Sequence, residues 1–397
     1  MYRQLLISLG LMAVLVHPST ATAARRYASS TGTATTECLS WANACSLNNA
    51  INAASSGDEV WVKQGTYGAI SLKSGVKIIG GFAGTETSAS QSKPDLHPTI
   101  LDGGGTGPVV TSENNTPGTT MLRGFRITHG HGAADLTADI AGGGMWLLNS
   151  GAVIVQCVFD HNTALYTGAA VAIRGGQPWF VNCEFHDNGT GGDGPARDEN
   201  TAPWAGGAIY VHSGSPTFMN CLFQHNKALE GGAMMVYNGT PVIVNSTFVN
   251  NRAGDGYGGA LSDEGAKAVI RNCIFWGNTA YKGSNQIFSA PQADSDVTYC
   301  DIQGGWTGTT NINVDPSFVN SGANDYRLNA NSPCVNAGKS SAPALPNDQG
   351  DLNWNSNTGE PTPLDLDRST RVWSLIGTPK VDMGAYEYFE ELSGGNL

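Results

Sequence analysis

The 397-residue sequence predicts an all-β solenoid, and three observations lead to this fold class. The chain holds 52 glycines, which disfavours helices because each glycine inside a helix costs about 1 kcal/mol. Only 14% of the residues are charged against 40% hydrophobic, which excludes a disordered chain, and no Gly-X-Y period indicates collagen. The third observation is an internal repeat with a period of 25 to 27 residues, stretched once to 38.

Five segments of the repeat share one pattern, in which a Cys or Ser precedes a Phe by two positions and an Asn by five. The copies are residues 155–162, 181–188, 219–226, 244–251 and 271–278, with a degenerate copy at 123–130. Gly-Gly-Ala recurs between them at 206–208, 231–233 and 258–260. Each unit contains three short β-like runs separated by Gly, Asn or Pro. Three strands per coil of this length predict a single-stranded right-handed parallel β-helix with capped ends.

Stacked coils place equivalent side chains about 4.8 Å apart, so each repeat position forms a ladder along the axis. The Cys and Phe positions are two residues apart and therefore both point inward. The Asn that precedes the Cys in four of the five copies suits a left-handed turn between the second and third strands, where its amide can pair with the next coil. Cysteines stacked in this way are found in metal and redox sites, but we favour small thiols that fill a narrow core.

The N-terminus predicts an export signal over residues 1–23. Met1 to Gln4 carries a positive charge, residues 5–16 are apolar, and Ala-Thr-Ala at 21–23 suits cleavage. We therefore expect a secreted, monomeric bacterial protein without a transmembrane segment after signal removal, and a cell-surface-associated form is the alternative. Export permits disulfides, and Cys38 with Cys45 is the best candidate pair.

The two ends of the solenoid need caps, because open coil edges aggregate. Residues 24–314 are expected to form the β-helix, with a short capping helix over 47–54, and residues 315–397 its last coils and cap. In this tail, Asp365, Asp367 and Asp382 are either Ca²⁺ ligands or, in the interpretation we favour, solvated turn carboxylates.

The repeats resemble right-handed β-helix proteins of the pectate-lyase-like superfamily, and most of all secreted bacterial proteins with polymorphic-outer-membrane-protein-type repeats. The tail motifs at 315–319, 325–328, 332–338 and 381–387 resemble the C-terminal region of the choice-of-anchor β-helix family. The resemblance implies the fold. It does not imply one function, because the superfamily contains lyases, hydrolases, epimerases and non-catalytic surface proteins.

The formal net charge of −12, with no basic stripe, excludes nucleic acid as a partner. The same charge gives no general attraction to an acidic polysaccharide. Such a substrate would require local Arg or His side chains, or a bridging cation.

Alternation along the strand after Gly-Gly predicts one exposed face that carries aromatic and polar groups. If Ile209 and Val211 point inward, Tyr210 and His212 point outward. The equivalent outward columns hold Trp146, Ala172, Tyr210, Met235 and Ser262 in one, and Leu148, Arg174, His212, Tyr237 and Glu264 in the other. Aromatic rings beside hydrogen-bonding groups suit stacking against sugars, whereas an ordinary amphipathic sheet face is the alternative.

Two long connections, 130–141 and 189–205, flank a coil whose own connection through Tyr166 is short. We expect them to wall a groove with Arg174 at its floor, in which Tyr166 and Trp204 add substrate contacts to those of Trp146, Tyr210 and Glu264. The carboxylates of the second connection, Asp193, Asp198 and Glu199, are candidate Ca²⁺ ligands.

The hypothesis for function is therefore binding of a polysaccharide or surface glycan, and cleavage of an acidic one by β-elimination. Arg174 would neutralise the uronate carboxylate or, as the resemblance to pectate lyases implies, act as base, while His212 and Tyr237 would carry protons. A non-catalytic adhesin or glycan-binding protein is the alternative. A glycoside hydrolase is the third, but it needs two carboxylates about 5 to 9.5 Å apart, and only Glu264 qualifies on the strand face.

Overall fold

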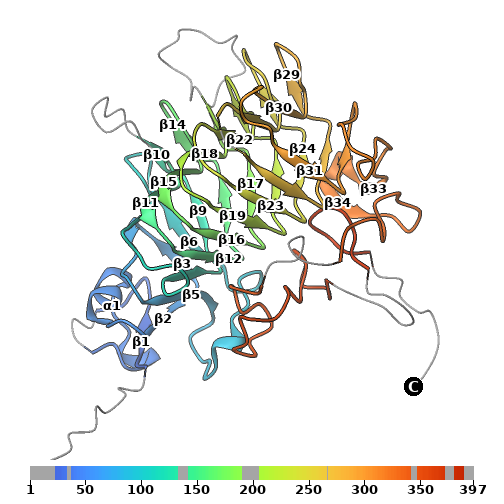
Figure 1. Cartoon of the computed structure of the whole chain (residues 1–397). Helices are drawn as coiled ribbons and strands as arrows, with labels where there is room; N and C mark the ends of the chain where they lie inside the picture. The colour runs from blue at the N-terminus through green and yellow to red at the C-terminus, as the bar shows by residue number, and fades with distance from the viewer. Residues whose placement is uncertain are drawn as a thin grey trace, which may run out of the picture.

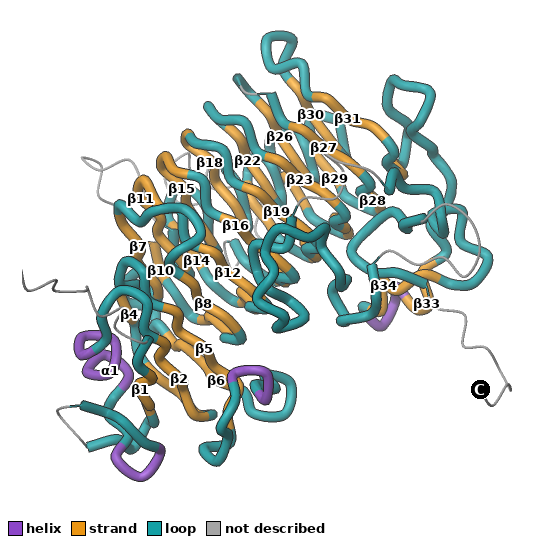
Figure 2. Tube along the Cα trace, turned by 60° about the horizontal axis from the view of Figure 1, so that its bottom comes forward, coloured by secondary structure: helices purple, strands orange, loops and turns teal. Residues whose placement is uncertain are grey.

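The computed structural model describes residues 23–33, 37–132, 142–189, 205–265, 267–340, 347–371 and 380–388. The predicted signal sequence lies almost wholly outside these residues, as do Asp193, Asp198, Glu199 and Trp204. Within them the chain winds into the predicted parallel β-helix, whose strands stack as rungs in three long sheets (Figures 1 and 2).

Each coil contributes one strand to each sheet. The first sheet contains β4 (Ile70–Ser71), β7 (Val110–Glu113), β11 (Met145–Ser150), β15 (Val171–Gly176), β18 (Ile209–Ser213), β22 (Met234–Val236), β26 (Leu261–Asp263) and β30 (Ile287–Ser289). The second contains β1 (Arg25–Ala28), β2 (Glu59–Lys63), β5 (Lys77–Phe82), β8 (Met121–Arg123), β12 (Val153–Val155), β16 (Trp179–Val181), β19 (Thr217–Met219), β23 (Val242–Val244), β27 (Val269–Arg271) and β31 (Asp296–Thr298). The third contains β3 (Gly65–Tyr67), β6 (Thr99–Asp102), β9 (Arg126–Thr128), β13 (Val158–Asp160), β17 (Glu184–His186), β20 (Leu222–Gln224), β24 (Thr247–Val249), β28 (Ile274–Trp276) and β32 (Asp301–Ile302).

Short elements complete the coils and the ends. Two-residue strands after the third sheet pair as β10 (His131–Gly132) with β14 (Thr163–Ala164), and as β21 (Lys227–Ala228), β25 (Arg252–Ala253) and β29 (Thr279–Ala280). The tail contains an antiparallel hairpin of β33 (Phe318–Asn320) and β34 (Asp325–Leu328). The helices are α1 (Leu47–Ala53) and the 3-10 turns η1 (Trp41–Asn43), η2 (Ala89–Gln91) and η3 (Ser321–Ala323).

The core consists of the predicted ladders. Phe159, Phe185, Phe223, Phe248 and Phe275 are all buried, and their rings stack with centroids 4.9, 4.7, 4.4 and 4.7 Å apart. The Cys ladder is also fully buried, and its thiols are free. Burial raises the pKa of Cys157 and of Cys221 to about 12, which keeps both thiols protonated and unreactive. Among the described residues, no group of three or more His, Cys, Asp or Glu side chains is placed to hold a metal.

Two asparagine ladders fix the turns. The first is the predicted one: Asn182, Asn220, Asn245 and Asn272 have φ between 48° and 54°, and Asn220 Nδ2 donates to Asn182 Oδ1 over 3.0 Å. The second ends the third strand of each coil and contains Asn162, Asn188, Asn226, Asn251 and Asn278, each at most 2% exposed. Each Nδ2 of its first four members donates to the Oδ1 of the next, over 2.8 to 3.1 Å.

Helix α1 confirms the short helix expected near the N-terminal end. Leu47, Ala50 and Ile51 are buried in the main core cluster against the first coil. A disulfide joins Cys38 to Cys45 just before the helix. At the opposite end, Trp306 packs against the same cluster. Helix α1 and the Trp306 side chain thus cover the two ends of the hydrophobic core.

The described part of the tail lies along the flank of the solenoid. Gly384 N donates to the carbonyl of Asn272, the carbonyl of Leu364 accepts from Asn220, and Arg368 pairs with Asp95 over 2.8 Å. In Figure 1 this segment, in red, runs back beneath the coils toward the cyan loop between β5 and β6. A capping role for residues 315–397 remains a prediction, since these contacts are with earlier coils.

Two of the three tail carboxylates are not solvated, contrary to our expectation. Asp365 is 0% exposed and accepts the backbone N–H groups of Ser369 and Glu387, over 2.7 and 2.6 Å. Asp382 is 2% exposed and accepts the N–H groups of Asn336 and Tyr388, each over 2.6 Å. They are buried turn carboxylates because the tail folds over them.

Loss of one ladder amide should destabilise the fold strongly. Replacing Asn226 with Ala removes the donor to Asn251 Oδ1 and to the carbonyl of Phe185, and orphans the buried N–H of Asn188. We expect a loss of about 2 to 4 kcal/mol in the free energy of unfolding, measured by urea denaturation. The exposed Asn238→Ala is the matched control, and equal stability of the two variants would contradict the role of the ladder.

The buried tail carboxyls predict that docking of the tail weakens as the pH rises. Burial, and then Asp367, raise the pKa of Asp365 to about 8, and burial raises that of Glu387 to about 9, against about 4 in an unfolded chain. Because folding favours the protonated forms, this stabilisation is complete below pH 4 and is lost as the pH rises toward 9. Hydrogen exchange of residues 365–371 and 380–388, corrected for intrinsic rates, should show less protection at pH 8.5 than at pH 6. Asp365→Asn should flatten this dependence, and equal protection of the unmodified chain at both pH values would refute it.

Candidate functional site

The outer face of the first sheet carries the first predicted column in a single row. Register pairs join Trp146 to Ala172, Ala172 to Tyr210, Tyr210 to Met235 and Met235 to Ser262. Trp146 and Tyr210 are half-buried, whereas Ala172, Met235 and Ser262 are buried by groups that lie over the sheet. The aromatic part of this column that faces solvent is therefore Trp146 and Tyr210.

The second column departs from the predicted alignment. Leu148 pairs with Arg174 as expected, but the register shifts after Ile173, so that Arg174 pairs with Ser213. His212 is the extra residue at this irregularity. The prediction that Arg174 and His212 lie in one row is wrong, because the strict inward-outward alternation of side chains along the strand ends at the bulge. The two residues still lie on neighbouring strands.

The bulge places His212 between two tyrosines. Its ring lies 6.4 Å from that of Tyr210 and 5.8 Å from that of Tyr237. His212 Nδ1 is buried and has no hydrogen-bond partner, while the Tyr237 side chain is 50% exposed. The His212 side chain as a whole is partly exposed, so a ligand on this row meets the imidazole ring although Nδ1 itself is covered.

A pair of carboxyl groups lies beside the row, and one of them was missed in the sequence. Ser262 Oγ donates to Glu230 Oε1 over 3.2 Å, and the Glu264 carboxyl lies close enough to Glu230 to feel its charge. Burial first, and then the charge of Glu230, raise the pKa of Glu264.

The sequence signal for Glu230 is its place directly before Gly231-Gly232. Tyr257 occupies the same place before Gly258-Gly259, and its ring stacks on Phe288 of the next coil with centroids 4.5 Å apart. The residue before Gly-Gly thus leans over the first sheet of the following coil. Alternation within strands does not reveal this rim of side chains.

Thr167 stands in line with Glu230 in this rim, and Tyr166 precedes it. The Tyr166 carbonyl accepts from Ala205 N over 3.3 Å, and bridges join Thr167 to Ala205 and Ala205 to Glu230. The residues expected to wall the groove, 133–141 and 190–204, lie outside the described part of the chain, and so do the proposed Ca²⁺ ligands. Calcium binding stays a prediction.

No helix in the described residues is long and apolar enough to cross a membrane. No curated protein sequence matches the chain. Among solved structures, the chain is similar to the crystal structure of pectate lyase Pel9A, at 15% sequence identity and a TM-score of 0.40. The match covers 92% of this chain and 97% of that one.

The family model described as "Right handed beta helix region" matches residues 109–313, which is more than half of the 397 residues. These residues include β7 to β32 with all five complete repeats and both asparagine ladders. The chain therefore belongs to the right-handed β-helix family.

Proposed function

We propose that the outer face of the first sheet binds an acidic polysaccharide and cleaves it by β-elimination. The observation that carries this proposal is the row of Tyr210, His212 and Tyr237 on the outer face, with the exposed Arg174 on the neighbouring strand. Aromatic rings at strand spacing suit stacking of successive sugar rings. Trp146 and Tyr166 extend the same surface, and Trp204 is proposed to do so.

β-Elimination requires three groups, and this face supplies one for each task. Arg174, on the strand next to His212, neutralises the uronate carboxylate and so acidifies the C5 proton. The partly exposed imidazole of His212 takes that proton, the C4–O bond breaks, and a C4–C5 double bond forms. The exposed hydroxyl of Tyr237 gives a proton to the leaving oxygen. Arg174 as base, with a Ca²⁺ ion held by Asp193, Asp198 and Glu199, is the alternative arrangement within the same reaction.

The carboxyl pair bears on the two other candidate functions. Glu230, beside Glu264, supplies the second carboxyl group that a hydrolase needs, so a glycoside hydrolase stays the third candidate. A non-catalytic adhesin or glycan-binding protein would use the same aromatic row without the proton transfers. Export, a monomeric state, and the likeness of the tail to choice-of-anchor proteins remain part of the proposal.

The reaction is tested by incubating the full chain with a panel of uronans and following the absorbance of unsaturated ends. His212→Ala and Arg174→Ala should each lower kcat/KM by about 10²- to 10⁴-fold, because each removes a group used in proton transfer or in charge neutralisation. Tyr237→Phe should lower kcat more than it raises KM. The control is Tyr281→Phe, since Tyr281 is 76% exposed and on another part of the coil.

Full activity of both His212→Ala and Arg174→Ala would refute the assignment of the site. If the unmodified chain binds uronans but forms no unsaturated product, with or without Ca²⁺, the lyase proposal is wrong. The non-catalytic glycan-binding function would then take its place.

The carboxyl pair should weaken the binding of an anionic chain that extends over it. Glu264→Gln removes the like charge beside Glu230, so we expect uronan affinity, measured by calorimetry, to rise by roughly three- to tenfold at pH 8. The gain should shrink as the pH is lowered, because the raised pKa of Glu264 means that protonation removes its charge sooner than that of an ordinary carboxyl. Glu37→Gln removes an exposed charge at the N-terminal end and serves as the control. Weaker uronan binding by Glu264→Gln would show that Glu264 instead donates to the substrate.

A further inference from the structure

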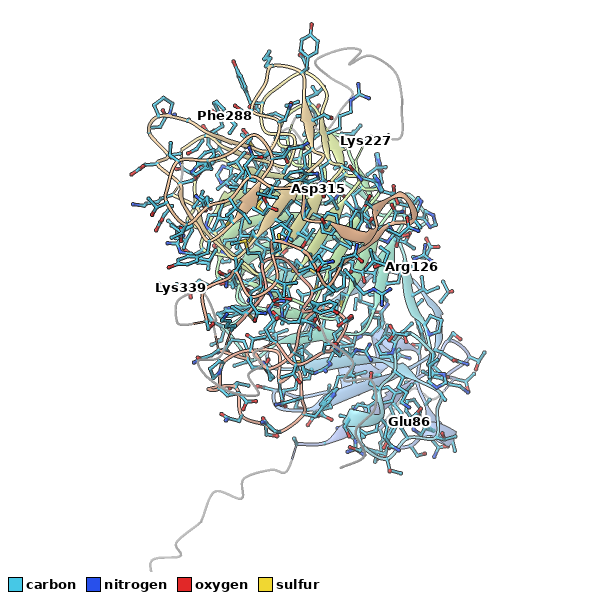
Figure 3. The ribbon with its side chains drawn as sticks, turned by 90° about the vertical axis from the view of Figure 1, so that its right-hand side faces the viewer. Glu86, Arg126, Lys227, Phe288, Asp315 and Lys339 are labelled. Atoms are coloured by element: carbon cyan, nitrogen blue, oxygen red, sulfur yellow. A yellow bond between two sulfur atoms is a disulfide. The ribbon has the colours of Figure 1, made fainter. Side chains whose placement is uncertain are left out.

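The outer face of the third sheet changes character along the solenoid. In later coils Leu222, Val249 and Trp276 pack under Tyr326 of the β33–β34 hairpin. In earlier coils Arg126, Val158 and Glu184 occupy the column of Leu222, and Asp160 and His186 that of Val249 and Trp276. The hairpin thus leaves a charged stretch of the sheet uncovered. Figure 3 labels Arg126 on this side, away from Phe288 of the first sheet.

A cleft of about 120 Å³ lies over this charged stretch. Its floor includes Arg126, Val158 and Glu184, and its walls are the loop with Pro94 and Asp95 and the tail segment with Leu366 and Arg368. The Arg368–Asp95 ion pair, 2.8 Å long, joins the two walls. Three segments that are far apart in the sequence therefore build the cleft.

The cations around the cleft already have partners. Arg126 makes two hydrogen bonds to Asp160, over 2.8 and 2.6 Å, and Arg368 is paired with Asp95. The carboxylate of Asp160 is itself fully buried and also bonds His161 Nδ1 over 2.7 Å. These pairs leave no cation of the described cleft lining for Glu184.

The Glu184 carboxyl is the group without a partner. It makes no hydrogen bond or ion pair with any described residue, although it lies in the cleft floor and is only partly exposed. Burial, and to a smaller extent the charge of Asp95, raise the pKa of Glu184, while His186, which is bonded to Asp187 over 3.1 Å, lowers it. A partly buried carboxylate beside no cation is stabilised by one that enters the cleft, so a cation from outside the chain is favoured here.

The size and lining of the cleft indicate what kind of molecule carries that cation. A cavity of about 150 Å³ holds one benzene molecule, so this open cleft of about 120 Å³ encloses one edge of a sugar ring and leaves the rest of the ring in solvent. Val158 and Leu366 offer an apolar surface, while Gln156 and Arg368 offer polar groups. A pyranose has one face of C–H groups and an edge of hydroxyls, which matches this mixture.

We propose that this cleft is a binding site for a hexosamine unit, whose ammonium group pairs with the Glu184 carboxylate and whose ring packs on Val158. The site lies on a different sheet from the Tyr210–His212–Tyr237 row and does not depend on the function proposed for that row. It would recognise an amino sugar, either free or at the end of a glycan.

The test is calorimetric titration of the full chain with glucosamine, glucose, N-acetylglucosamine and n-butylamine at pH 6.5. Glucosamine should bind at least tenfold more tightly than each of the other three, because only glucosamine combines the charge-assisted hydrogen bond with a ring of hydroxyls. Glu184→Gln should remove the preference for glucosamine over glucose. Val158→Phe should abolish binding by filling the cleft, and Glu37→Gln should bind as the unmodified chain does.

Circular dichroism and the thermal transition of each variant show whether it remains folded. Equal binding of glucose, or glucosamine binding that survives both Glu184→Gln and Val158→Phe, would overturn the proposal. If n-butylamine binds as tightly as glucosamine, the cleft recognises an ammonium group alone, and the proposal of a sugar site is overturned. Titration with chitosan oligomers then distinguishes a terminal glycan unit from the free amino sugar.

Discussion

The buried asparagine ladder at the end of the third strand is the interaction on which the other features depend. Each amide serves two coils at once: Asn188, for example, donates to Asn226 Oδ1 and to the carbonyl of Phe159. A side chain bonded to the coils on both sides fixes the position of every turn relative to the next. Buried amides tolerate no slippage, because a shift by one residue would leave their donors unpaired.

This fixed register explains why the faces of the solenoid carry ordered columns. Once the turns are aligned, the phenylalanines stack in the core and the outward residues of successive coils lie about 4.8 Å apart. A row such as Tyr210, His212 and Tyr237 can then meet successive units of a polymer. The bulge at His212 is a local departure that the ladder tolerates, since it lies at the end of a first-sheet strand.

The tail divides the third sheet into a covered and an open part. The hairpin residue Tyr326 packs on Leu222 and Val249, and where no hairpin covers the sheet the outward residues include Arg126 and Glu184. Sequence and packing therefore agree coil by coil on which part of the face meets water. The charge-poor composition of the chain has the same origin, because neighbouring coils cover most strands.

Much of the fold could be predicted because its signals repeat. Cys157, Phe159 and Asn162 recur at one spacing, and a repeated spacing can result only from a ladder. The bulge at His212 could not be predicted, since nothing in its local sequence distinguishes an extra residue from ordinary alternation. Glu230 was missed because it lies directly before Gly231-Gly232, outside the three main strands of its coil, where strand alternation does not apply. The path of the tail was missed because contacts such as Arg368 with Asp95 join non-repeating segments far apart in sequence.

The most direct test of the account is hydrogen exchange of the full chain with and without a bound uronan oligomer. The central claim is that the register-fixed face of the first sheet receives the polysaccharide. It predicts that the oligomer slows exchange in β15, β18 and β22, around Arg174, His212 and Tyr237, and leaves the third sheet unchanged. Slowed exchange confined to β9, β13 and β17, or no change in β18 while the oligomer is bound, would contradict it.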